Sequence, residues 1–305
     1  MAELRFDGRV AIVTGAGGGL GREHALLLAS RGASVVVNDL GGAQDGTGSS
    51  ATPAEKVVEE ITAAGGTAVA DPNNVATPEG GAAIVQTALD AFGRVDILVN
   101  NAGILRDKSF SKMDVADWDV VIAVHLRGTM CVTQPAWRHM RERGYGRIVN
   151  TTSASGLFGN FGQTNYGAAK MGVVGLTKVL AQEGARDGIT ANAIAPMART
   201  RMTESLIGPL ADRLAPALVS PVVAWLAHED CTVTGEVLSC GGGRVARVFV
   251  AATPGWFDPA PDPEGVRDHW EAITAEPGYV VPRNNFEEVA QLVERLRADS
   301  GTGSV

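Results

Sequence analysis

The chain has 305 residues, of which 45% are hydrophobic, enough to build one large domain or one domain with an appendage. Its formal net charge of −8 leaves no basic surplus to neutralise phosphates, which argues against a nucleic-acid partner. No apolar run reaches the roughly 18 residues of a membrane span, and the charged amino terminus does not resemble a signal peptide. The three cysteines form no CxxC pair, so we expect reduced thiols, no bound metal and a cytoplasmic protein.

Short apolar runs alternate with helical stretches along most of the chain. The predicted strands cover residues 9–14, 33–38, 67–70, 95–100, 147–151 and 189–194, and the predicted helices cover 23–31, 53–64, 80–92, 118–143 and 166–185. Apolar strands that alternate with helices form parallel sheets covered on both faces. The sequence therefore predicts an α/β fold, a doubly wound Rossmann-type parallel sheet that binds ligands beyond the carboxyl ends of its strands.

The character of the sequence changes after Gly243. Residues 244–263 contain four prolines, and two helix-like stretches follow at 266–273 and 286–297. We predict a main domain at 1–243 and a C-terminal extension at 244–305, which packs on the core or on a partner subunit.

A glycine-rich loop joins the first predicted strand to the first helix. Its spacing is TGxxxGxG, through Gly15, Gly19 and Gly21, with Leu20 between the last two. Glycine lets the backbone approach a pyrophosphate closely, and the helix amino terminus favours its negative charge. A flexible glycine loop without a ligand is the alternative.

Asp39 stands directly after the second predicted strand. A carboxylate at this place accepts hydrogen bonds from the ribose 2′-hydroxyl and repels a 2′-phosphate. Because the glycine loop also lacks Lys and Arg, the sequence favours NAD over NADP. The alternative is that Asp39 only shapes the turn before Gly41 and Gly42.

Tyr166 and Lys170 are four residues apart on a predicted helix, so both side chains lie on one face. An ammonium beside a phenol favours the phenolate and lowers the tyrosine pKa, which suits proton transfer at neutral pH. An ordinary surface helix is the alternative. Further candidates follow three other strands and should converge on the same crevice: Ser153, the run Asn101, Ala102 and Gly103, and Pro196.

These motifs, TGxxxGxG, NNAG, Ser…YxxxK and the proline after the sixth strand, resemble those of the short-chain dehydrogenases/reductases over about residues 8–243. The resemblance implies that Tyr166 is the acid/base, that Lys170 lowers its pKa and holds the nicotinamide ribose, and that Ser153 bonds the substrate oxygen. It implies that Asn101 and Gly103 line the cofactor.

Two positions depart from the family pattern. His125 stands where the family usually has an asparagine, and we expect it to preserve the proton relay. Asn73 and Val75 stand in the slot of the usual Asp-Val adenine contact, so we expect an amide to replace a carboxylate there.

A narrower likeness is carried by residues 37–42, 124–128, 153–156, 159–163, 194–196 and 201–203. They look like the (3R)-hydroxyacyl-CoA dehydrogenase units of the peroxisomal multifunctional enzyme type 2 family, also called type 4 17β-hydroxysteroid dehydrogenases. The likeness implies NAD-dependent oxidation of a 3-hydroxyacyl-CoA in lipid metabolism, by a stand-alone bacterial form that is a homodimer or homotetramer. We expect residues 197–215 to cover the substrate.

Three other functions stay open. The substrate could instead be a 17β-hydroxysteroid or a steroid side-chain CoA ester. A 3-oxoacyl-carrier-protein reductase is less favoured, because that role prefers NADPH and needs no extension. A non-catalytic NAD-binding sensor would use the same fold.

Overall fold

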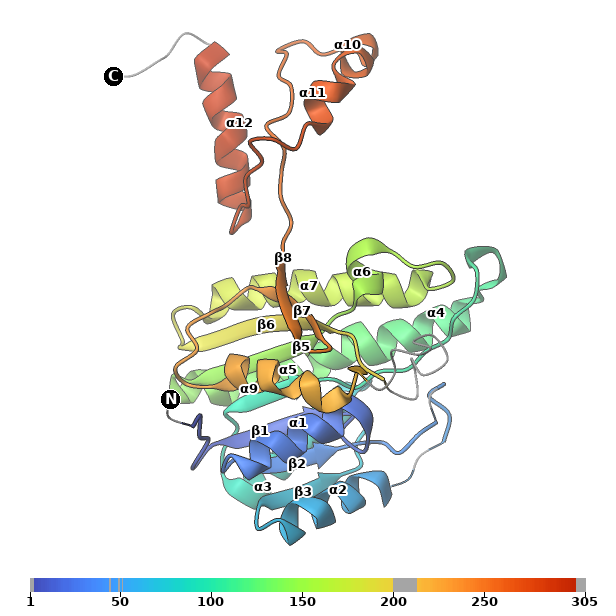
Figure 1. Cartoon of the computed structure of the whole chain (residues 1–305), viewed down its shortest axis with the longest axis vertical. Helices are drawn as coiled ribbons and strands as arrows, with labels where there is room; N and C mark the ends of the chain where they lie inside the picture. Colours follow the sequence, from blue (N-terminus) through green and yellow to red (C-terminus); the bar gives the residue numbers. More distant parts are fainter. Residues whose placement is uncertain (1–2, 44, 49, 51, 200–212, 300–305) are drawn as a thin grey trace. The chain divides into compact units, whose positions relative to one another are not determined.

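The computed structural model describes residues 3–43, 45–48, 50, 52–199 and 213–299 (Figure 1). The chain divides into two compact units, one ending at Arg247 and the other beginning at Val248. A division after Gly243, as the sequence predicts, would cut off a strand that belongs to the sheet of the first unit. No helix among the described residues is long and apolar enough to cross a bilayer.

The described part of the first unit holds one eight-stranded sheet with the order β3-β2-β1-β4-β5-β6-β7-β8. The strands are β1 (Val10–Thr14), β2 (Ser34–Asn38), β3 (Thr67–Asp71), β4 (Ile97–Asn100), β5 (Gly146–Thr151), β6 (Ile189–Pro196), β7 (Val237–Gly241) and β8 (Arg244–Val248). Neighbouring strands from β3 to β7 pair in parallel, which confirms the predicted doubly wound sheet. The chain changes direction across the sheet between β1 and β4, and such a switch point opens a ligand crevice.

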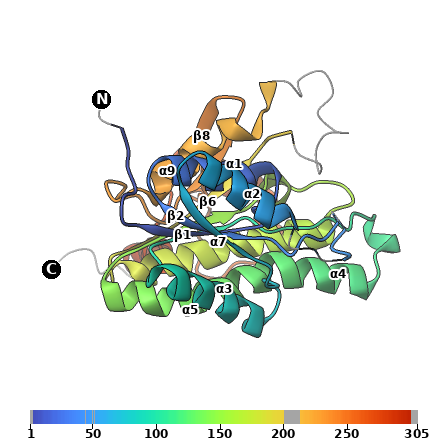
Figure 2. The ribbon, with the colours of Figure 1, turned by 90° about the horizontal axis from the view of Figure 1, so that it is seen from below.

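Helices cover both faces of this sheet. They are α1 (Gly19–Ser30), α2 (Thr52–Ala63), α3 (Pro78–Phe92), α4 (Val115–Ile122), α5 (Gly128–Arg143), α6 (Ala154–Phe158), α7 (Thr164–Gly184) and α9 (Ser220–Ala227), with short 3-10 turns η1 (Phe110–Lys112) and η4 (Pro216–Leu218). Figure 2 shows α1, α2 and α9 on one side and α3, α4 and α5 on the other.

Alternate side chains of β1 explain the two layers. Ala11 and Val13 pack in the cluster that includes α1, α2 and α9, whereas Val10 and Ile12 pack in the cluster that includes α3 and α5. A strand with apolar residues on both faces must be covered on both faces. Each large side chain buried in this way contributes roughly 1.5–3 kcal/mol.

The long helix that the sequence predicts over 118–143 is interrupted. The structure has α4, then the π-helical turn η2 (Ala123–Arg127), then α5. The wider turn carries His125, which is buried. Single π turns within helices occur often at functional sites, and apolar periodicity does not reveal them.

The second unit contains α10 (Pro263–Asp268), α11 (Trp270–Thr274) and α12 (Asn285–Asp299). The helix predicted over 266–273 is therefore two short helices that break at His269, whose ring stacks on Trp256 with centroids 4.4 Å apart. Packing of this unit on the core or on a partner subunit stays a prediction.

Candidate active site

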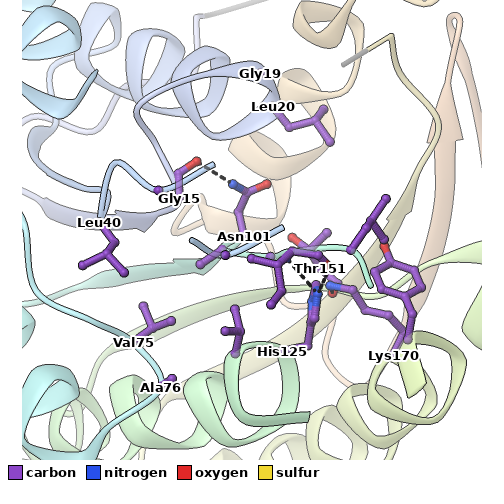
Figure 3. A pocket seen from close by; sticks show the side chains of 18 of the residues that line it. Gly15, Gly19, Leu20, Leu40, Val75, Ala76, Asn101, His125, Thr151 and Lys170 are labelled. Carbon is purple, nitrogen blue, oxygen red and sulfur yellow. Dashed lines mark hydrogen bonds between the residues drawn. The ribbon is translucent and has the colours of Figure 1, made fainter. Parts of the chain in front are cut away.

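A cavity of about 450 Å³ lies beyond the carboxyl ends of the parallel strands. It is lined by these sequence-predicted residues: Gly15, Gly19, Leu20, Asp39, Asn73, Val75, Asn101, Ala102, Gly103, His125, Ser153, Tyr166, Lys170 and Pro196 (Figure 3). Gly21 is the one predicted site residue that does not line it. The structure thus brings together residues that are far apart in the sequence.

The glycines of the first loop have different roles. Gly15 and Gly19 adopt positive φ angles of 63° and 53°, which favour glycine. A Cβ on Gly15 would lie 2.7 Å from the Cα of Ala102, so the loop packs directly against the end of β4. A Cβ on Gly21 would lie 2.3 Å from the carbonyl oxygen of Gly15. Gly21 therefore lets α1 pack against the loop instead of facing a ligand.

The amino terminus of α1 has the features of an anion-binding site. Gly18 is the N-cap residue and offers no capping side chain, and the first turn contains no acidic residue. Backbone N–H groups at such an end carry a partial positive charge. The pyrophosphate of a dinucleotide fits this end of the cavity.

Asn101 clamps the loop to β4. Its side-chain amide donates to the carbonyl oxygens of Thr14 and Gly15, each at 3.0 Å, and Figure 3 shows the bond to Gly15. The hydroxyl of Thr14 accepts from the backbone N–H groups of Asn101 and Ala102 at 3.0 and 3.1 Å. The threonine of the TGxxxGxG motif thus fixes the segment that follows β4 against the end of β1.

Asp39 lies at the end of β2 with both carboxylate oxygens anchored. One accepts from the N–H of Gly17 at 2.8 Å and the other from the N–H of Gly41 at 2.7 Å. Asp39 therefore shapes the turn and also presents a negative charge to the cavity. Lys170 is the only Lys or Arg among the described lining residues, so nothing basic there offsets that charge near Asp39.

Tyr166 and Lys170 both project from α7 into the cavity. The Lys170 ammonium lies 5.6 Å from the centre of the Tyr166 ring and donates to the carbonyl oxygen of Thr151 at 2.6 Å. The Ser153 hydroxyl accepts from the N–H of Ser155 at 3.2 Å at the amino end of α6, and Ser153 lines the same cavity as Tyr166. The hydroxyl of Thr152 donates to the carbonyl oxygen of Lys170 at 2.7 Å and ties α7 to the end of β5.

The pKa values of Tyr166 and Lys170 differ from what their spacing on the helix predicts. Burial raises the pKa of Tyr166, while the Ser153 hydroxyl lowers it and the charge of Asp107 raises it. Burial also lowers the pKa of Lys170 to about 7. In the protein alone, the desolvation of Tyr166 therefore outweighs the lowering of its pKa that the spacing of the pair predicts.

Comparison with known proteins identifies the family. The sequence model described as short chain dehydrogenase matches residues 9–208. The chain belongs to the short-chain dehydrogenase family. It is 55% identical over 268 residues to a putative short-chain type dehydrogenase/reductase of Mycobacterium tuberculosis, covering 87% of this chain and 94% of that one. Members of the family are oxidoreductases that use NAD or NADP.

Two peroxisomal enzymes are also similar. The chain is 48% identical over 301 residues to peroxisomal multifunctional enzyme A of Dictyostelium discoideum, covering 98% of this chain and 68% of that one. It also matches the solved structure of full-length peroxisomal multifunctional enzyme type 2 from Drosophila melanogaster with a TM-score of 0.82 and 41% identity. That match covers 97% of this chain and 50% of the fly enzyme.

In this short-chain dehydrogenase, His125 joins the end of β4 to the tyrosine. Its Nε2 lies 2.8 Å from the carbonyl oxygen and 3.1 Å from the nitrogen of Ile104. Its Nδ1 is buried and has no partner among the residues that the structure describes. Burial, and then the charge of Lys170, hold the His125 pKa well below its ordinary value, so the ring is neutral.

The glycine of the NNAG motif makes room for this histidine. A Cβ on Gly103 would lie 2.5 Å from Cε1 of His125. Gly103 therefore has a packing role beside its place in the cavity wall, which motif matching alone does not show.

Behind Asn73 lies a carboxylate that the sequence motifs did not predict. Asp71, at the end of β3, accepts from the side-chain amides of Asn38 and Asn73, each at 2.8 Å. Asp71 is buried, and Asn73 lines the cavity in front of it. The amide predicted at Asn73 is thus oriented by a carboxylate behind it. The sequence signal for this was an aspartate directly after the predicted strand over 67–70.

Proposed function

We propose that this enzyme oxidises the secondary alcohol of a (3R)-3-hydroxyacyl-CoA to the 3-oxoacyl-CoA, with NAD as the hydride acceptor. One observation carries the reaction type: Ser153, Tyr166 and Lys170 share one cavity with a glycine loop and Asp39. The substrate class is supported by the likeness to two peroxisomal multifunctional enzymes over nearly the whole chain. A 17β-hydroxysteroid or a steroid side-chain CoA ester is the second candidate, because the cavity wall contains the apolar side chains of Ile104, Leu105 and Val120.

The cofactor lies across the crevice in this proposal. The amino end of α1 holds the pyrophosphate, Asp39 binds the adenosine ribose, and Lys170 binds the nicotinamide ribose. We favour NAD because a 2′-phosphate beside the anchored Asp39 carboxylate would be repelled. The bound nicotinamide ring supplies the hydride acceptor and a positive charge.

The side chains of this chain handle the proton. Tyr166, as phenolate, accepts the proton of the substrate hydroxyl. The hydride leaves the carbon that bears this hydroxyl, and a ketone remains. The Ser153 hydroxyl donates to the substrate oxygen and steadies the developing carbonyl. Because burial raises the Tyr166 pKa, we expect the oxidation rate to rise with pH.

His125 completes a proton relay in this proposal. Its unpaired Nδ1 is buried at the cavity wall, and the charge of Lys170 acts on it. A neutral imidazole can accept or donate one hydrogen bond there, and so hold a water molecule between itself and the Lys170 ammonium.

The proposed function can be tested with one assay. We expect NADH production with (3R)-3-hydroxyacyl-CoA esters, measured beside a panel of 17β-hydroxysteroids. Replacing Tyr166→Phe should lower kcat by about 10²- to 10⁴-fold, as expected for loss of a general base, while NAD binding persists. Unchanged turnover in Tyr166→Phe would contradict the role of Tyr166 as the general base. No NAD-dependent turnover of any panel member by the native chain would favour a non-catalytic NAD-binding sensor.

Assembly and location stay predictions. A homodimer or homotetramer is checked by light scattering of the purified chain. The cytoplasmic location is checked by fractionation of the source cells. Residues 200–212, within the stretch expected to cover the substrate, lie outside the described residues.

A further inference from the structure

Three polar side chains meet beside Tyr166 and are not used by the chemistry described above. The side-chain amide of Gln163 donates to the carboxylate of Asp107 at 2.6 Å. The amide of Asn160 donates to the side-chain carbonyl of Gln163 at 2.9 Å. Gln163 is only 8% exposed and lines the cavity, together with Asn160.

Gln163 does not serve the helix that it precedes. It occupies the N-cap position of α7, where its backbone carbonyl accepts from the N–H of Gly167 at 2.7 Å. Short side chains such as Ser, Thr, Asn and Asp are preferred at an N-cap, because they bond to the first free N–H groups. The Gln163 side chain makes no such bond. Its amide bonds Asp107 instead, and the residue lines the cavity.

The orientation of the Gln163 amide is fixed by chemistry. An ionised carboxylate only accepts hydrogen bonds, so the –NH₂ group must face Asp107 and the carbonyl must face the Asn160 amide. An –NH₂ group has two N–H donors, and Asp107 takes one of them. The second donor is left for a ligand in the cavity.

We propose that this second N–H of Gln163 binds the thioester carbonyl of the substrate and makes Gln163 a specificity-determining residue. The inference rests on the proposed function. In a 3-hydroxyacyl-CoA, one methylene group separates the thioester carbonyl from the carbon that bears the hydroxyl. Tyr166 takes that hydroxyl, and Gln163 is three residues before Tyr166. Both residues line the same cavity, and the Asp107 carboxylate that holds the Gln163 amide also acts on Tyr166 through its charge.

This contact separates the two candidate substrate classes. A 17β-hydroxysteroid has no carbonyl one methylene away from its hydroxyl, so Gln163 would gain nothing from it. A site that holds a donor for a substrate carbonyl leaves that donor unpaired when the carbonyl is missing, and rejects the analogue. Gln163 thus favours β-hydroxy thioesters over simple secondary alcohols.

Asp107 has a second effect through its charge. Four groups act on Tyr166: Asp107 after β4, the neutral His125 of η2, Ser153 at α6 and Lys170 of α7. Asp107 is the one whose negative charge raises the Tyr166 pKa. Asp107→Asn keeps an oxygen acceptor for Gln163 but removes that charge. Asp107 is therefore a positioning residue whose charge also affects the pH dependence of the reaction.

The test compares two CoA ligands that differ in one group. The first is the 3-hydroxyacyl thioester, and the second is its thioether analogue, in which the carbonyl is a methylene. We expect the native enzyme to prefer the thioester in kcat/KM, and Gln163→Met to lower that preference by about 10- to 100-fold, the value of a hydrogen bond in a buried site. Where turnover of the thioether is too slow to measure, its inhibition constant replaces kcat/KM.

A matched control lies on α3. Gln86 donates to the Asp90 carboxylate at the same 2.6 Å, but it does not line the cavity. Gln86→Met should leave the preference unchanged. Asp107→Asn should keep the preference and move the pH–rate profile of oxidation to lower pH, which a purely structural role would not do.

The outcomes are distinct. An unchanged thioester preference in Gln163→Met, or an unchanged pH profile in Asp107→Asn, would overturn the inference while the native enzyme still oxidises the thioester. A native enzyme that oxidises only other alcohols would instead overturn the proposed function.

Discussion

The ring of His125 stands edge-on to the ring of Tyr166, with centroids 5.0 Å apart and planes at 87°. The π-helical turn η2 presents the histidine, and Gly103 leaves space for it. Nε2 of the same ring bonds the backbone of Ile104, as donor to the carbonyl oxygen at 2.8 Å or as acceptor from the N–H at 3.1 Å, according to the tautomer. One side chain therefore connects the end of β4 to the proposed acid/base.

Replacing His125 tests this connection. His125→Asn can still bond the Ile104 backbone, so we expect kcat within several-fold of the native value. His125→Ala leaves the Ile104 backbone group that bonds Nε2 without this partner, at a cost of about 1–3 kcal/mol in the free energy of unfolding, and we expect kcat to fall about 10-fold or more. Steady-state kinetics and denaturant titration measure the two effects. If both variants kept the native rate, the side chain would have no part in the relay.

Replacing Asp39 tests cofactor choice. Asp39→Asn removes the charge that repels a 2′-phosphate and weakens the bonds to the ribose, so the ratio of kcat/KM for NAD over NADP should fall about 10- to 100-fold. Asp45 is the matched control. It lies in the same loop and accepts from the N–H and hydroxyl of Thr47, but does not line the cavity. Asp45→Asn should leave the ratio unchanged, and an equal change in both variants would contradict the role of Asp39.

The burial of His24 makes the free energy of unfolding depend on pH below neutrality. His24 is fully buried in α1, bonds Ser220 at 2.8 Å, and burial lowers its pKa from 6.5 to about 3. Between these pH values the unfolded chain binds a proton that the folded chain does not. The free energy of unfolding should therefore fall as the pH drops from 6.5 toward 3, by up to about 3 kcal/mol at pH 4.

The His24→Gln variant isolates this contribution. A glutamine side chain does not titrate, so the difference in the free energy of unfolding between native chain and variant should shrink as the pH falls. His139→Gln, at a partly exposed position 3.7 Å from Glu142, is the control. Urea titrations from pH 7 to pH 4 measure both. A constant difference for His24→Gln would mean that His24 is not buried in its neutral form.

Deleting residues 250–305 tests the C-terminal extension. The deletion leaves β8 and the whole sheet in place, since the second unit begins at Val248. We expect acyl-CoA turnover to fall more than NAD binding, because the extension is predicted to wall the acyl cavity or to lie at a subunit interface. Fluorescence titration with NADH and assays with short and long acyl chains give the comparison. Equal activity on long-chain substrates after deletion would sink this prediction.

Periodicity predicted the six strands β1 to β6 and most of their helices, because parallel strands buried on both faces leave short apolar runs in the sequence. It did not predict β7, β8, α6 or α9. It also predicted one helix where the structure has α4, the π turn and α5, since the residues stay helical from one element to the next and no break marks the turn. The second unit shows a similar error at His269, where a stacking contact accompanies the break.

By itself, the sequence determined the kind of chemistry, because TGxxxGxG, NNAG and YxxxK are local spacings that encode a phosphate loop and a tyrosine–lysine pair. Only the tertiary structure decided how these groups are tuned. Burial lowers the pKa of Lys170 and raises that of Tyr166. Contacts in the folded chain place the carboxylate of Asp71 behind Asn73 and bond Gln163 to Asp107. Desolvation and hydrogen bonding depend on which groups are close in the folded chain. The spacing of motifs along the sequence therefore does not predict them.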